Sequence, residues 1–142
     1  MNDLTRFVKA QDSQYGSYSQ ALEEMKSGGK RSHWIWYIFP QIVGLGRSEM
    51  AQHYAIKDLD EAKEFLSHPV LGSRLREITS VVLSFPENAE PDDFMMSHID
   101  AMKLKSSMTL FNIISPDDIF GQVLDKFFDG KQDYRTLRVV GK

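Results

Sequence analysis

The first group of residues with the types and spacing for ligand chemistry lies between positions 30 and 36. It consists of Lys30, Arg31, His33, Trp34 and Trp36. Arginine grips a phosphate or carboxylate through two parallel hydrogen bonds, and a helix start at this point would add N–H groups that favour anions. The competing interpretation, which we favour, is that the tryptophans are buried core anchors and the cations are solvated.

A second candidate is the glycine loop at positions 44–48, where Gly44-Leu45-Gly46 is followed by Arg47 and Ser48. A glycine loop that leads into a helix N-terminus can cradle a phosphate group. This loop is neither a Walker loop nor a complete dinucleotide fingerprint. We therefore favour a flexible turn in which Ser48 caps the next helix, and keep Arg47 and Ser48 as ligand-binding candidates.

The third group consists of Asp100, Lys103, Ser106 and Ser107. Spacings of three and four residues place Asp100, Lys103 and Ser107 on one face of a helix. A desolvated lysine could take a proton from a serine hydroxyl, although the usual serine–lysine motif has the serine first. We favour an Asp–Lys helix pair with small packing residues over catalysis, and leave ligand contact open.

The four histidines show no His-Glu-x-x-His spacing, so we expect no metal site. We also expect no cofactor. His68 precedes Pro69 at an expected helix start, which suits a helix cap. The function that the three groups predict is binding of a small phosphate- or carboxylate-bearing ligand in one shared pocket, with enzymatic activity left open. The alternative is a protein-interaction module or homo-oligomer that uses the aromatic segment or the loop Phe94-Met95-Met96.

The elements that must position these groups are helices. Apolar residues at Leu71, Leu75, Ile78, Val82 and Phe85 recur at spacings of four and three, which place them on one helix face. Further helices are expected to begin at Asp3, Ser17, Ser48, Asp58, Pro69, Ser97 or Ile99, Ser115-Pro116 and Asp133. Residues 1–142 therefore predict one compact all-α domain with about seven to nine helices.

The stretch 32–39 is ambiguous because it is apolar on every side and rich in strand-favouring residues. We favour a short buried helix that Pro40 ends. Positions 86–91, between two prolines, are expected to form a loop.

Composition narrows the class of protein. The 142 residues include 42% hydrophobic and 26% charged residues and no cysteine, and the net charge is −3. No apolar run approaches the ~20 residues of a membrane helix, and the first residues lack a signal-peptide pattern. We expect a cytoplasmic protein that does not associate with membranes. The acidic balance argues against nucleic acid as a partner.

Several short motifs of the sequence resemble those of a known family of small bacterial and fungal proteins, domain-of-unknown-function family 1810. They are Arg6-Phe7, Ala10-Gln11, Lys30-Arg31-Ser32-His33-Trp34-x-Trp36, Phe39-Pro40-Gln41, Gly44-Leu45-Gly46-x-Ser48, Glu61-Ala62, His68-Pro69-x-Leu71-Gly72-x-Arg74-Leu75, Asp100-x-Met102-Lys103-x-x-Ser106-Ser107-x-Thr109-Leu110-Phe111 and Thr136-Leu137. The resemblance implies an all-α single-domain fold and no particular activity. Where the family is expected to have an aromatic–glycine pair, this chain has Met96-Ser97, which argues against a tight turn there.

Overall fold

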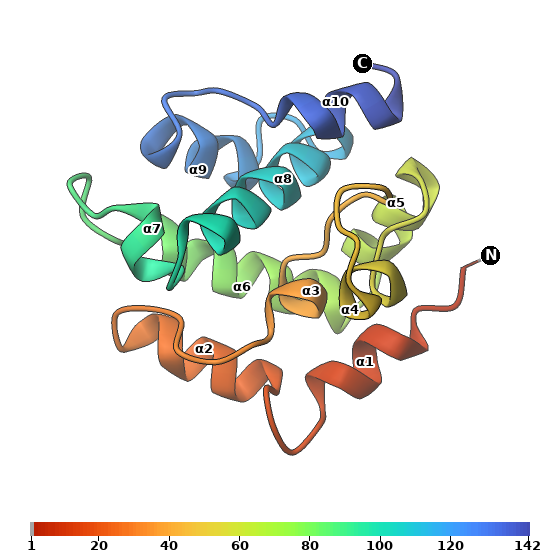
Figure 1. Ribbon diagram of the computed structural model, residues 1–142, viewed down its shortest axis with the longest axis horizontal. Coiled ribbons are helices and arrows are strands. Elements are labelled where there is room, and N and C mark those ends of the chain that lie inside the picture. Colours follow the sequence, from red (N-terminus) through yellow and green to blue (C-terminus); the bar gives the residue numbers. More distant parts are fainter. Residues whose placement is uncertain (1) are drawn as a thin grey trace.

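Helices account for the regular structure of the chain, apart from one isolated bridge between Ile42 and Ile56. The computed structural model describes residues 2–142, in which there are ten helices (Figure 1). These are α1 (Thr5–Gln11), α2 (Tyr18–Lys26), α3 (Ile35–Ile38), α4 (Glu49–His53), α5 (Leu59–Ser67), α6 (Leu71–Leu83), α7 (Pro91–Phe94), α8 (His98–Ile114), α9 (Ile119–Phe127) and α10 (Tyr134–Val140). The prediction of a compact all-α domain is confirmed, with a count slightly above the expected range.

Polar caps begin five of the helices where the sequence predicts them. Ser17, Ser48, Asp58, Ser97 and Asp133 each accept a hydrogen bond from the backbone N–H three residues later. Each cap satisfies a donor that the first helical turn leaves without a partner.

Four helix starts differ from the prediction. Helix α1 begins at Thr5 with Leu4 at its N-cap, and Asp3, the predicted cap, accepts the Thr5 N–H at 2.9 Å from outside the helix. Helix α9 is capped by Asp118 rather than by Ser115, whose hydroxyl instead donates to Asp118 Oδ2 at 2.6 Å. Pro69 precedes α6 instead of lying in its first turn. The predicted cap there is confirmed, because His68 Nδ1 accepts the N–H groups of Val70 and Leu71. Helix α7 forms where we expected a loop to end, because Pro91 suits a first helical turn.

The ambiguous stretch 32–39 contains the short buried helix α3, as favoured from the sequence. The residue at its N-cap is Trp34, and Ser32 lies outside the helix. The helix ends at Ile38, two residues before Pro40, because proline disfavours helical geometry in the residue that precedes it.

The longest helix, α8, runs through the middle of the protein and packs against α3, α5, α7, α9 and α10 (Figure 1). Its buried side chains are not confined to one stripe, which fits a helix surrounded by others. It carries the third polar group, and its contact with α3 brings that group beside the aromatic segment. No helix within residues 2–142 has the length and apolar character needed to cross a membrane.

The loop Phe94-Met95-Met96 does not form the contact surface considered in the sequence, because Phe94 and Met95 are buried. Met96 has a φ of +78°, in the left-handed region that favours glycine. The tight turn before α8 is therefore present without a glycine, which corrects the expectation drawn from Met96-Ser97.

Candidate functional site

The loop at positions 30–34 is held in place by Glu24 of α2. Its carboxylate accepts the backbone N–H groups of Arg31 and Ser32 at 2.7 and 3.0 Å, the Ser32 hydroxyl at 2.6 Å and the Trp34 indole N–H at 2.9 Å. Partial burial raises the pKa of Glu24, but these bonds and one from Gln20 outweigh it and hold the pKa at about 2. Trp34 is completely buried, so this part of the motif is structural, as we favoured.

The side chain of Lys30, the first residue of this loop, is buried. Its backbone N–H donates to the Phe94 carbonyl at 2.8 Å, and its ammonium lies 2.8 Å from Asp100 Oδ2 and 5.2 Å from the centre of the Trp34 ring. The ion pair lacks hydrogen-bond geometry, so Lys30 Nζ has no hydrogen-bond partner among the described residues. The first and third polar groups of the sequence are therefore in contact, through the pair of Lys30 with Asp100 of α8.

Lys103 completes a cluster of two ammonium groups and one carboxylate. Its Nζ lies 4.0 Å from Asp100 Oδ1 and 5.5 Å from the centre of the Trp36 ring. The Lys103 side chain is 23% exposed, whereas those of Lys30 and Asp100 are 0% and 11% exposed. The cluster thus carries one positive charge in excess, and the more accessible ammonium is that of Lys103.

Trp36 also forms a wall of a cavity, which we call the Trp36 cavity. Its volume is about 420 Å³, and it is lined by Trp36, Gln41, Ile42, Val43, Gly44, Gly46, Ala51, Gln52, Tyr54 and Ala55. The polar side chains in this lining are two amides and a phenol, and none of the lining residues is charged. Trp36 is therefore the element shared by the cavity and the charged cluster.

Two sets of contacts hold the walls of the Trp36 cavity together. The first is the bridge between Ile42 and Ile56, in which Val43 N–H donates to the Ile56 carbonyl and Ile56 N–H donates to the Gln41 carbonyl, both at 2.8 Å. Only two backbone hydrogen bonds are involved, but they join the two chain segments that line the cavity.

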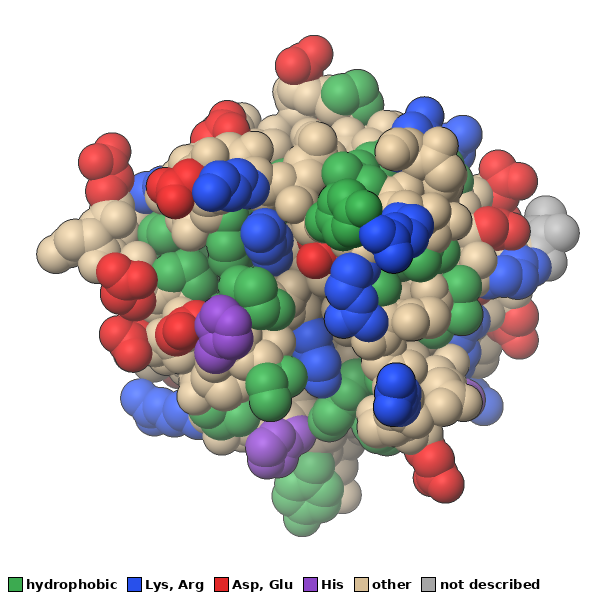
Figure 2. Space-filling model, turned by 45° about the horizontal axis from the view of Figure 1, so that its top comes forward, with side chains coloured by type: hydrophobic (Ala, Val, Ile, Leu, Met, Phe, Trp, Pro, Cys, Tyr) green, Lys and Arg blue, Asp and Glu red, His purple; other side chains and the backbone are tan. Residues whose placement is uncertain are grey.

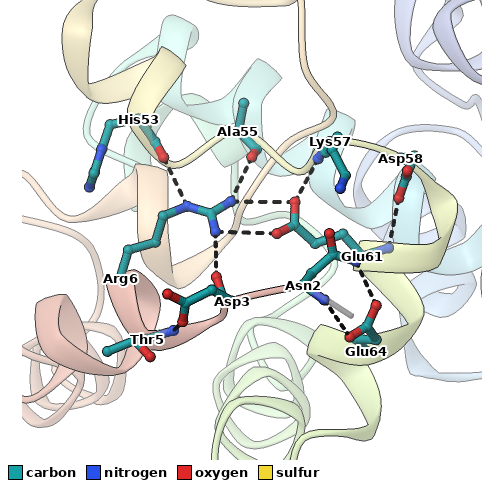
Figure 3. Close-up of polar contacts among 10 residues, drawn as sticks. All are labelled: Asn2, Asp3, Thr5, Arg6, His53, Ala55, Lys57, Asp58, Glu61 and Glu64. Atoms are coloured by element: carbon teal, nitrogen blue, oxygen red, sulfur yellow. Dashed lines mark hydrogen bonds and ion pairs between the residues drawn. The ribbon is translucent and has the colours of Figure 1, made fainter.

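The second set of contacts is made by Arg6 of α1 (Figure 3). Its guanidinium donates to the His53 and Ala55 carbonyls, both at 2.9 Å, and is paired with the buried Glu61 carboxylate. Glu61 in turn accepts the Lys57 N–H at 2.7 Å. Arg6 is thus a positioning residue for the segment that carries Tyr54 and Ala55.

The glycine loop forms a rim of the cavity rather than a phosphate cradle. The Ser48 hydroxyl is used as the cap of α4, and Arg47 is exposed and does not line the cavity. Arg135 of α10 donates to the Leu45 carbonyl at 2.9 Å and so ties the loop to the C-terminal helix. The favoured prediction, a turn followed by a helix cap, describes the loop correctly.

The remaining candidates divide between surface and core. Arg31 and His33 are exposed, and neither lines the Trp36 cavity. The Ser106 hydroxyl donates to the Met102 carbonyl at 3.0 Å, whereas Ser107 is completely buried. Within the described residues, four buried side-chain polar atoms have no hydrogen-bond partner, and three of them belong to predicted candidates: Lys30 Nζ, Trp36 Nε1 and Ser107 Oγ.

Basic side chains are concentrated on one face of the protein. On the face shown in Figure 2, Lys and Arg side chains gather around a hollow in which a single acidic group is visible. Residues 2–142 contain no cluster of three His, Cys, Asp or Glu residues that could hold a metal ion.

Four residues of the site were not identified from the sequence: Arg6, Gln41, Gln52 and Tyr54. In the sequence these polar side chains look like ordinary solvated residues, and no periodicity marks them. The only available signal was the resemblance, since Arg6-Phe7 and Phe39-Pro40-Gln41 are among its matching motifs.

Comparison with known proteins identifies the family of the chain and a solved structure with the same fold. A family model described as "Protein of unknown function (DUF1810)" matches residues 1–140. The chain is also similar to the crystal structure of the conserved hypothetical protein Rv1873 from Mycobacterium tuberculosis, with 38% identity and a TM-score of 0.89. That match covers 99% of this chain and 97% of the other. No curated protein matches the sequence.

Proposed function

The chain belongs to the DUF1810 family, and we propose that it binds a small ligand bearing a phosphate or carboxylate group. The body of the ligand would occupy the Trp36 cavity, and its anionic group would lie against the Lys103 ammonium. One observation carries the proposal: the indole ring that forms a cavity wall is also the ring whose centre lies 5.5 Å from Lys103 Nζ.

The charges of the cluster favour an anion. Asp100 lies closer to Lys30 than to Lys103, at 2.8 Å against 4.0 Å, so the buried lysine compensates most of the carboxylate charge. The ammonium of Lys103 retains N–H donors and is partly exposed. Such a group forms short, charge-assisted hydrogen bonds with phosphate or carboxylate oxygens.

The cavity has the size and rigidity of a small-molecule site. Its volume of about 420 Å³ lies within the ~300–1,000 Å³ of typical ligand pockets. Its walls are held by the Ile42–Ile56 bridge and by Arg6. A pre-formed cavity loses less conformational entropy when a ligand binds, which favours affinity.

The first experiment is a thermal-shift screen against inorganic phosphate, sugar phosphates, nucleotides and dicarboxylates, followed by titration of the best probe. A probe present at 100 times its dissociation constant stabilises the protein by about 2.7 kcal/mol, which such a screen detects. We expect Lys103→Met to weaken that probe about tenfold or more, because a charge-assisted hydrogen bond is lost.

Lys105→Met is the matched control, since Lys105 lies two residues further along α8 and therefore on another helix face. The control should bind the probe as the unchanged protein does. The proposal fails if no anionic probe raises the melting temperature, or if the two methionine variants lose affinity equally.

We also propose that the protein is located in the cytoplasm and that it does not bind nucleic acid. The support for these proposals is the cysteine-free sequence, which suits a reducing compartment, and the net charge of −3. The alternative of a homo-oligomer predicts a mass above 16.3 kDa in light scattering.

A further inference from the structure

The polar side chains that line the Trp36 cavity are uncharged and largely free to bind a ligand. The Gln41 amide makes no hydrogen bond within the described part of the chain. Gln52 uses its Nε2 to donate to the Arg47 carbonyl at 2.7 Å, which leaves its carbonyl oxygen available. The Tyr54 hydroxyl likewise has no partner in residues 2–142, while its ring packs 5.1 Å from that of Tyr37.

These groups form a recognisable pattern. The free amide of Gln41 offers one acceptor and two donors side by side, and the residues that carry a second acceptor and a hydroxyl also line the cavity. The edge of a heteroaromatic ring that carries an adjacent donor and acceptor is complementary to such an amide, as in glutamine pairing with adenine.

The rest of the lining favours a flat ring over a polyol. Ile42, Val43, Ala51 and Ala55 present apolar surface, and Trp36 presents an aromatic wall. Any of the nucleobases can stack on such a wall, because every base has a π-face. A sugar alone would set its hydroxyl groups against apolar side chains, where they lose hydrogen bonds to water.

We infer that the ligand is a nucleotide, with its base in the Trp36 cavity beside Gln41 and its phosphate at Lys103. This inference rests on the proposed function and narrows the class of ligand. Trp36 lines the cavity and lies beside Lys103, which is not itself a lining residue, so the ligand would extend from the cavity past Trp36 to Lys103. The predicted division of labour is that Gln41 reads the base and Lys103 holds the phosphate.

The test is isothermal titration calorimetry with five probes: AMP, UMP, adenosine, ribose 5-phosphate and inorganic phosphate. We expect at least one nucleotide to bind tenfold or more tightly than ribose 5-phosphate. Gln41→Ala should weaken that nucleotide severalfold and leave ribose 5-phosphate unchanged. Lys103→Met should weaken the nucleotide and ribose 5-phosphate but leave adenosine unchanged.

Gln14→Ala provides the control, because Gln14 is exposed in the turn between α1 and α2 and does not line the cavity. Gln41→Glu adds a second variant that keeps the size of the side chain and replaces its donors with a charge. It should lose nucleotide affinity although the protein melts as a folded domain.

The possible results separate the two proposals. If ribose 5-phosphate binds as tightly as both nucleotides, or if Gln41→Ala leaves nucleotide affinity unchanged, base recognition is wrong and anion binding stands. If adenosine binds as well as AMP and Lys103→Met has no effect, base recognition stands and anion binding is wrong. If none of the five probes binds, both are wrong.

Discussion

At the scale of single residues, two tryptophans that are two positions apart serve different purposes. Trp34 lies at the N-cap of α3, whereas Trp36 lies within the helix. Trp34 is buried and donates to Glu24, whereas Trp36 forms a wall of the cavity. The motif therefore combines a structural support, Trp34, with a residue that lines the cavity, Trp36.

Glu24 is the residue whose ionisation should matter most for stability at low pH. Its pKa is depressed from 4.5 to about 2, so its carboxylate contributes stability that is fully present above pH 4.5 and is lost as the pH falls towards 2. We expect Glu24→Gln to reduce the free energy of unfolding by about 1–2 kcal/mol at pH 7. Urea unfolding should show this difference shrinking between pH 4.5 and 2.

Glu23→Gln is the control for this prediction. Glu23 is the neighbouring exposed residue, and its carboxylate makes no hydrogen bond within residues 2–142. Its replacement should change stability by less than about 0.5 kcal/mol at every pH. A difference between wild type and Glu24→Gln that stays constant down to pH 2 would show that the ionised carboxylate is not the cause.

At the scale of elements, the junction between α5 and α6 depends on one glycine. Gly72 lies in the first turn of α6 and is buried. A Cβ atom built on it would lie 1.9 Å from the Leu66 carbonyl oxygen, so the two helices approach each other too closely for any side chain. The obstacle is backbone of the end of α5, which cannot move without shifting the helix.

We therefore expect Gly72→Ala to be strongly destabilising, by about 3 kcal/mol or more, although alanine is the better helix former. The matched substitution is Gly121→Ala in α9, where the nearest atom is Oδ1 of the flexible Asn112 side chain. Thermal unfolding should show a large loss for the first variant and a small change for the second. Equal melting temperatures would contradict the proposed close approach.

At the scale of the whole molecule, charge is unevenly distributed. The chain has 17 basic and 20 acidic residues, yet basic side chains gather around the hollow of one face (Figure 2). A local excess of this kind suits one small anion. Binding to a polyanion requires many phosphate contacts at once, and their sum is opposed by the net charge of −3.

We expect the protein to pass through a heparin column at about 50 mM salt without retention, because few counterions would be released on binding. The small anionic probes that bind in the cavity should do so under the same conditions. Retention on heparin that persists to about 200 mM salt would indicate a nucleic-acid partner and would contradict this expectation.

The sequence by itself determined the helices. Apolar spacing such as that from Leu71 to Val82 and caps such as Ser17 and Asp58 act over three or four residues, so their effect is readable locally. Where neighbouring groups compete, as at Asp118, the same local rules misplaced a boundary by a few residues.

Only the tertiary structure decided the site. The Lys30–Asp100 pair joins residues far apart in the chain, and the cavity exists because the Ile42–Ile56 bridge and Arg6 hold two loop segments against Trp36. No periodic pattern encodes such contacts, because they depend on how helices pack and not on the spacing within any one of them.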